Sequence, residues 1–108
     1  EVRDHFGMDV QVDRADFDIE LDYVRGGYNL PSEEVRKAVE FMASKEGILM
    51  DPCYTGKAFA GIMDMVREGK IKQEEKVIFI HTGGMPGLYT PAHRVEFEKE
   101  LMDGVHVL

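Results

Sequence analysis

The 108-residue sequence predicts an α/β fold in which helices pack on a parallel sheet, and two observations carry this prediction. Residues 77–80 (VIFI) are apolar at every position, which is typical of a strand buried on both faces of a parallel sheet. Two amphipathic helical patterns precede this strand and a glycine-rich loop follows it, an order of elements typical of α/β proteins. Because such a strand needs neighbours on both sides, and the chain offers one other strand candidate, the sequence predicts an incomplete unit.

Composition places the chain among globular proteins and excludes several classes of function. Hydrophobic residues make up 44% of the sequence, and the length leaves room for one core. The formal net charge of −8 argues against a nucleic-acid partner, because a phosphate backbone would be repelled. We expect no membrane partner, since no apolar run reaches the roughly 18 residues of a bilayer span. We also expect no metal, because the four histidines are widely spaced, and the single cysteine, Cys53, is compatible with the cytoplasm.

The first 29 residues contain one clear periodic pattern. Residues 1–8 suggest the end of a short helix that Gly7 closes. Residues 17–24 alternate apolar and mostly acidic side chains, the period of a strand with one solvated face. An extended arm lying across another surface would show the same pattern, so both interpretations stay open. The two glycines within residues 25–29 (RGGYN) predict a turn.

Two central helices are predicted from their caps and their apolar stripes. The first begins after Ser32, a suitable N-cap residue, and ends at Gly47, where a left-handed cap is expected. The second begins near Thr55 and ends at Gly69. Each carries apolar residues at helical spacing. These are Val35, Ala38, Val39 and Met42 in the first helix, and Phe59, Ile62, Met63 and Val66 in the second.

A third helical pattern lies near the end of the sequence. Pro91 begins it and Thr90 is its candidate N-cap residue. Phe97 and Leu101 supply apolar contacts, and Gly104 is expected to stop the helix.

The polar residues at the start of the second helix have a spacing that suits an active site. Tyr54 can give or take a proton, and Lys57 can pair with an anion at the helix N-terminus. The alternative is an interior tyrosine, a capping threonine at Thr55 and a solvated lysine, and the residues alone favour this alternative.

A second candidate site is the loop His81-Thr82-Gly83-Gly84, which follows the predicted strand. Ligands of open α/β sheets bind beyond the carboxyl ends of the strands. Gly83 would let the backbone approach a ring or a phosphate, and Thr82 supplies a neutral hydroxyl. A simple tight turn would use the same residues. Together with the polar residues around Tyr54, this loop suggests part of the wall of an active site.

Three stretches resemble the family of D-cysteine desulfhydrase and 1-aminocyclopropane-1-carboxylate deaminase. They are residues 46–69 (EGILMDPCYTGKAFAGIMDMVREG), 77–84 (VIFIHTGG) and 26–35 (GGYNLPSEEV). In the last of them Asn29 replaces the family's usual glycine. The resemblance implies a pyridoxal-phosphate enzyme of fold type II, the tryptophan-synthase-β-like group. It covers residues 26–87 and fails after Leu88, so residues 88–108 form a tail that departs from the family pattern.

Carried over residue by residue, the resemblance implies roles for three residues. Tyr54 matches the family's active-site tyrosine, which faces the substrate and takes part in proton transfer or substrate positioning. Thr82, beside Gly83, matches the threonine whose hydroxyl meets the pyridine nitrogen of the cofactor in the desulfhydrase branch, a neutral partner that suits β-elimination. Thr55 stands where the deaminase branch carries glutamate, which favours the desulfhydrase-like branch.

The resemblance also implies a reaction and explains why this chain alone should not perform it. We expect α,β-elimination from a small amino acid, giving a keto acid and ammonia, in a cytoplasmic homo-oligomer. The family's Schiff-base lysine, serine loop and phosphate loop lie upstream, and nothing in residues 1–108 matches them. The chain is therefore expected to be a C-terminal fragment that is inactive by itself. The alternative is a non-catalytic structural module that buries its exposed sheet edges by self-association.

Overall fold

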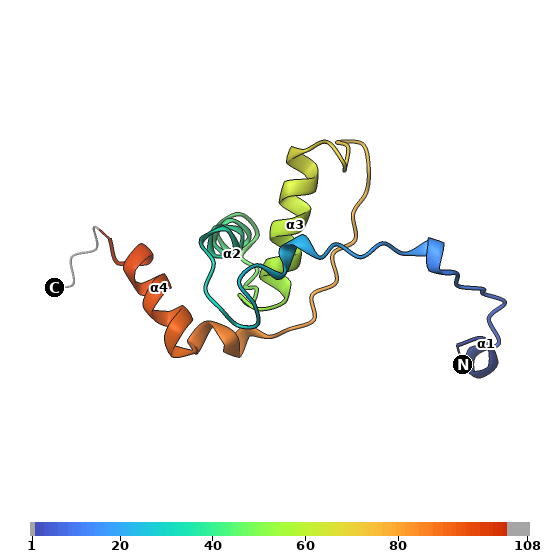
Figure 1. The fold of residues 1–108 in the computed structure, drawn as a ribbon, viewed down its shortest axis with the longest axis horizontal. Coiled ribbons are helices and arrows are strands. Elements are labelled where there is room, and N and C mark those ends of the chain that lie inside the picture. The colour runs from blue at the N-terminus through green and yellow to red at the C-terminus, as the bar shows by residue number, and fades with distance from the viewer. Residues whose placement is uncertain (1, 104–108) are drawn as a thin grey trace.

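The chain, in a computed structural model that describes residues 2–103, is built from helices joined by extended segments (Figure 1). The α-helices are α1 (Val2–Phe6), α2 (Glu33–Glu46), α3 (Thr55–Arg67) and α4 (Pro91–Leu101), and the 3-10 helices are η1 (Arg14–Asp16), η2 (Asp22–Val24) and η3 (Met85–Tyr89). The molecule measures 62 × 31 × 27 Å, because α1 and η1 lie on an arm that projects from the helical body. None of the helices within residues 2–103 has the length and apolar character needed to cross a bilayer.

The core lies between α2 and α3. Val35 and Val39 of α2 and Met50 of the following link are buried together. Gly56 lets α3 approach α2 closely, since a β-carbon there would lie 2.9 Å from Val39 Cγ2 and 3.0 Å from Val35 Cγ1. Half-buried side chains from across the chain pack against this core. They are Met42, Phe59, Phe79, Leu88 and Phe97.

The predicted ends of α2 and α3 and the predicted N-cap residue of α4 agree with the structure. Gly47 closes α2 in the left-handed conformation (φ 69°), and its N–H donates to Ala43 O at 3.0 Å. Gly69 (φ 73°) follows the end of α3, and Thr90 is the N-cap residue of α4. The predicted stop at Gly104 lies outside the residues that the structure describes.

Three details of the helix predictions are corrected by the structure. Ser32 is the N-cap residue of α2, but its side chain makes no capping hydrogen bond. The N-cap residue of α3 is Tyr54, and Thr55 is already helical because its side chain binds backward to Asp51. Val66, expected in the buried stripe, is 53% exposed because the C-terminal half of α3 extends past α2 (Figure 1).

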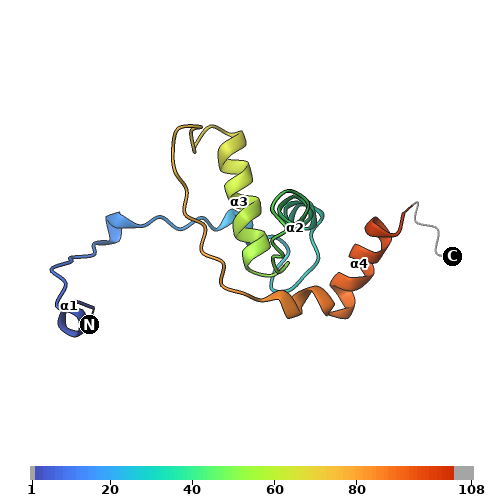
Figure 2. The ribbon, with the colours of Figure 1, turned by 180° about the vertical axis from the view of Figure 1, so that it is seen from behind.

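The predicted strands do not form, and residues 2–103 contain no sheet. Residues 77–80 run as an extended segment beside α3 (Figures 1 and 2), where Phe79 packs on Phe59 with ring centroids 5.8 Å apart. Ile78 is 90% exposed. Residues 17–24 are an exposed arm that ends in η2, which agrees with the extended-arm interpretation. A β-strand is stabilised by main-chain hydrogen bonds to a neighbouring strand. Within residues 2–103 no segment forms such hydrogen bonds with residues 77–80.

Helix α4 is attached to α2 through a charged pair. The guanidinium of Arg36, which is 7% exposed, donates from Nε to Glu100 Oε2 at 3.0 Å and from Nη2 to Glu100 Oε1 at 2.7 Å. Two parallel hydrogen bonds to one carboxylate fix the orientation of both side chains. The pair therefore sets how α4 lies on the core.

Candidate active site

The centre of the candidate site is the buried carboxylate of Asp51, which precedes α3. Its Oδ2 accepts hydrogen bonds from the backbone N–H groups of Cys53 and Tyr54, both at 2.7 Å. Its Oδ1 accepts from the N–H of Thr55 at 2.7 Å and from the Thr55 hydroxyl at 2.6 Å. Asp51 thus binds the free amides at the start of α3. The sequence predicted only a turn at this position.

The electrostatics of Asp51 follow from these contacts. Burial by itself would raise the pKa of the carboxyl, but the hydrogen bonds from Thr55, Tyr54 and Cys53 outweigh it and hold the pKa below its ordinary value. Asp51 is therefore ionised, and its charge lies at the positive end of the α3 dipole. The amides on which the predicted anion site depended are consequently bonded within the chain.

The glycine loop lies directly against Asp51, which joins the two predicted parts of the site. A β-carbon on Gly84 (φ 91°) would lie 2.7 Å from Asp51 Cγ, and one on Gly87 would lie 3.5 Å from Pro52 Cδ. Residues 81–84 and the start of α3 are therefore neighbours.

His81 fixes the path of the same loop. Its Nδ1 accepts from the N–H of Gly83 at 3.1 Å, so its Nε2 carries the proton and donates to Leu49 O at 2.9 Å. Thr82 is exposed on this loop, and a β-carbon on Gly83 would meet nothing within 4 Å. The loop thus presents a hydroxyl and open space beside its backbone.

Tyr54 lies at the start of α3 and is 58% exposed, beside Tyr28, a tyrosine for which the sequence predicted no role. The ring of Tyr28 meets that of Tyr54 edge to face, with centroids 6.0 Å apart. A hydrogen bond with the side chain of Tyr28 is the main cause that raises the pKa of Tyr54 to about 12. The Tyr54 hydroxyl therefore keeps its proton at neutral pH. Tyr28 belongs to the glycine-tyrosine turn, which was the available signal.

Lys57 is neither a free anion partner nor a solvated lysine, as the two interpretations of the sequence had it. It is 9% exposed, and its Nζ donates to Val24 O at 2.8 Å and to Gly27 O at 2.6 Å. The ammonium thereby holds η2 and residues 25–29, called the glycine turn below, against α3. Tyr28 thereby lies next to Tyr54, and both residues line a hollow of about 400 Å³.

The structure places the segments of three predicted site residues next to Asp51 and buries the fourth predicted site residue, Thr55. Tyr54 and the loop that carries Thr82 and Gly83 both adjoin Asp51. Thr55 is 2% exposed, and its hydroxyl is bonded to Asp51, so it supports this surface from within. Within residues 2–103, no group of three histidine, cysteine, aspartate or glutamate side chains is arranged to hold a metal.

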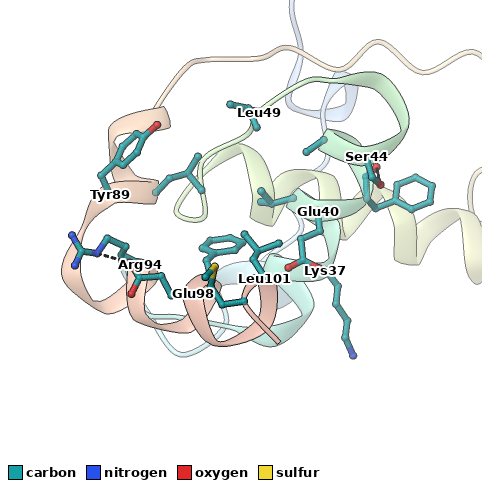
Figure 3. Close-up of a pocket in the computed structure, with 14 residues that line it drawn as sticks. Lys37, Glu40, Ser44, Leu49, Tyr89, Arg94, Glu98 and Leu101 are labelled. Carbon is teal, nitrogen blue, oxygen red and sulfur yellow. Dashed lines mark hydrogen bonds and ion pairs between the residues drawn. The ribbon is translucent and has the colours of Figure 1, made fainter. Parts of the chain in front are cut away.

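A larger apolar groove, of about 960 Å³, lies elsewhere, between α2, η3 and α4 (Figure 3). Phe97 and Leu101 contribute to its wall, and an ion pair between Arg94 Nε and Glu98 Oε1 (3.1 Å) lies at its rim. None of the predicted site residues lines it. The larger groove is therefore separate from the predicted site residues.

Two exposed residues of the segments that meet at Asp51 carry groups able to contact a pyridoxal ring. Tyr54 and Thr82 offer hydroxyl groups, and the space beside Gly83 admits a flat group close to the backbone. A lysine that could bind the cofactor covalently is missing from this surface in the described part of the chain, because Lys57 is held by two carbonyl groups. The described residues therefore offer contacts to the cofactor but no covalent attachment to it.

Comparison with known proteins agrees with this chemistry. Residues 4–83 match the family described as pyridoxal-phosphate dependent enzymes, and the chain belongs to that family. Over 76 residues it is 46% identical to a D-cysteine desulfhydrase of Klebsiella pneumoniae (strain 342). That match covers 70% of this chain and 23% of the relative, so the chain spans about a quarter of that enzyme's length. The family resemblance, its fold type II class and pyridoxal phosphate as the family's cofactor are thereby confirmed.

Proposed function

We propose that this chain is one wall of the active site of a pyridoxal-phosphate-dependent lyase that removes the β-substituent and the amino group of a small amino acid. The reaction is desulfhydrase-like and gives a keto acid and ammonia. The observation that carries the proposal is the junction at Asp51, which joins the start of α3 with Tyr54 to the glycine loop with Thr82. The similarity to a D-cysteine desulfhydrase supports the choice of reaction.

Each residue of the wall has a defined task in this proposal. When bound, the cofactor withdraws electrons from the substrate α-carbon. Tyr54, which keeps its proton because its pKa is raised to about 12, faces the substrate and positions it or donates a hydrogen bond to the departing group. Thr82 offers its hydroxyl to the ring nitrogen, and Gly83 lets the backbone lie close to the ring. Thr55 fixes Asp51 and, through it, the start of α3.

The rest of the protein completes the site in this proposal. It supplies the lysine that binds the cofactor and the loops for the phosphate and the substrate carboxylate, so residues 1–108 alone are inactive. It also supplies strands on both sides of residues 77–80, whose exposed Ile78 and Ile80 then become buried in a parallel sheet. Residues 88–108 form the tail that departs from the family pattern. We expect a cytoplasmic enzyme, which cell fractionation would test.

The proposal is tested with Tyr54→Phe in the full-length protein, compared with Tyr89→Phe. Tyr89 is 74% exposed and lies in η3, where it lines the larger groove rather than the hollow beside Tyr54, which makes it a matched control. Tyr54→Phe should lower turnover of a small D-amino acid such as D-cysteine by about 100-fold or more while the visible absorbance of the cofactor is retained. Tyr89→Phe should leave both unchanged. Equal turnover in wild-type protein and Tyr54→Phe would remove Tyr54 from this role.

A second candidate function follows from the exposed apolar side chains of residues 77–80. Without further strands, the chain would be a structural module that covers this segment by self-association. Sedimentation velocity of the purified chain separates the two cases. A folded monomer would contradict the module, whereas a discrete oligomer that lacks cofactor absorbance would favour it.

A further inference from the structure

His93 is the residue through which α4 reaches the glycine turn. It is 0% exposed, and its Nε2 lies 3.1 Å from both Asn29 O and Asn29 Oδ1. Both atoms accept hydrogen bonds, so Nε2 carries the proton and donates to them. The other ring nitrogen, Nδ1, is buried without a hydrogen-bond partner in the described structure. The imidazole is therefore bound in its neutral form.

Asn29 is held in a conformation that few residues other than glycine adopt. Its φ is 53°, in the left-handed region, which asparagine adopts more readily than most other residues with a side chain. Asn29 directly follows Tyr28, whose ring packs on Tyr54. A hydrogen bond from His93 to the Asn29 carbonyl thus restrains the backbone that carries Tyr28.

A second proton on His93 would be poorly accommodated. Burial lowers the pKa of His93 below its ordinary value, and the positive charges of Arg36 on α2 and Lys57 on α3 lower it further. The hydrogen bond with Asn29 and the carboxylate of Asp51, before α3, act in the opposite direction and are outweighed. On α4 itself, the nearby carboxylates of Glu96 and Glu100 are directed to Arg36. A proton at Nδ1 would therefore find no acceptor.

We propose that His93 is a positioning residue for the active site: while its ring is neutral, it holds the Tyr28–Asn29 turn and thereby the Tyr28–Tyr54 pair. This inference rests on the proposed function only where it concerns Tyr54. Its direction with pH is fixed. Because burial lowers the pKa of His93 in the folded state, the restraint is complete above the ordinary histidine value near 6.5, weakens as the pH falls below that value, and is lost as the pH passes through the lowered pKa.

The test is amide hydrogen exchange of residues 26–30 in the full-length protein, expressed as protection factors between pH 5 and pH 8. The variants are His93→Gln and His93→Leu, with His5→Gln on the exposed N-terminal arm as the control. A glutamine amide matches the donor at Nε2 and does not titrate. Wild-type protection should fall below about pH 6.5, by at most tenfold per pH unit for one proton. His93→Gln should keep protection constant, and His93→Leu should lower it about tenfold at every pH.

Either of two results would overturn the inference. One is the same acid-induced loss of protection in His93→Gln as in the wild-type protein, and the other is wild-type protection in His93→Leu. If His93→Leu does not fold, His93→Gln alone still decides the question. Exchange does not depend on turnover, so this test can fail while the Tyr54 test succeeds, and the reverse also holds. If both hold, the acid limb of the turnover profile should flatten in His93→Gln.

Discussion

Gly84 lies against the carboxylate of Asp51 so closely that a β-carbon would come within 2.7 Å of Asp51 Cγ and 2.9 Å of its Oδ1. This contact joins the glycine loop to the start of α3, although 33 positions separate the two residues in the sequence. It also makes the loop dependent on an aspartate that has no access to solvent. The two segments that carry the proposed site residues are therefore held together by a buried carboxylate that is not itself one of those residues.

Alanine at position 84 tests this contact directly. Gly84→Ala should lower the free energy of unfolding of the full-length protein by about 2–4 kcal/mol, from left-handed backbone strain and from the clash with Asp51. Gly83→Ala is the matched control, since its φ of 89° is nearly the same and its β-carbon would meet nothing within 4 Å. It should cost about 1–2 kcal/mol in denaturant unfolding. Equal losses of unfolding free energy in the two variants would mean that a β-carbon at position 84 does not clash with Asp51.

Removing the Tyr28 hydroxyl should change the ionisation of Tyr54. Since the hydrogen bond with Tyr28 is the main cause that raises the pKa of Tyr54 to about 12, Tyr28→Phe should lower that pKa towards its ordinary value of 10.0. The measurement is an ultraviolet titration of tyrosinate, with Tyr54→Phe to assign the transition and Tyr89→Phe as the control. An unchanged late transition in Tyr28→Phe would exclude Tyr28 as the cause.

Methionine at position 57 separates a structural role from a covalent one. Lys57→Met keeps the apolar stem and removes the ammonium that binds Val24 O and Gly27 O, at a cost of about 2–3 kcal/mol in unfolding free energy. Lys45→Met, on the exposed last turn of α2, should cost less than about 0.5 kcal/mol. Cofactor absorbance should survive in both variants. Borohydride reduction that fixes the cofactor on Lys57 would contradict this assignment.

Acid should weaken the protein through Asp51. Its pKa is held below the ordinary value of 3.8, so its contribution to stability is complete above that pH and disappears as the pH falls through the lowered value. Asp51→Asn should be less stable than wild-type protein by about 2–3 kcal/mol at neutral pH, and the difference should shrink below pH 3.8. Asp103→Asn, at an exposed site, serves as the control. A gap that does not vary with pH would point to lost packing rather than lost charge.

The parts of the fold that were predictable depend on nearest neighbours in the sequence. Gly47 closes α2 and Pro91 opens α4 because a left-handed residue stops a helix and a proline suits its first turn, whatever lies around them. The apolar residues 77–80 carry a strand preference as well, but a strand is completed by a partner from elsewhere. That part of the prediction could not be met within this chain.

The supports of the site were harder to predict than the residues that face outward. Tyr54 and Thr82 were identified through the family resemblance, whereas Asp51 was assigned only a turn and Tyr28 no task. An aspartate just ahead of a helix that begins at Thr55 is a visible capping signal, and it was available in the sequence. No sequence pattern indicated a role for His93, because its contact with Asn29 joins residues that are distant in the sequence.

The exposure of residues 77–80 has a consequence for handling the protein. Four uncharged side chains with high β-propensity, with Ile78 almost fully in solvent, form the nucleus of an aggregating segment. The charged residues 74–76 stand directly before it, and the whole chain carries a net charge of −8. Such flanking charges act as gatekeepers, because copies of the segment repel one another before they can stack. Salt screens this repulsion. The aggregation rate of the isolated chain, measured by light scattering, should therefore increase with ionic strength.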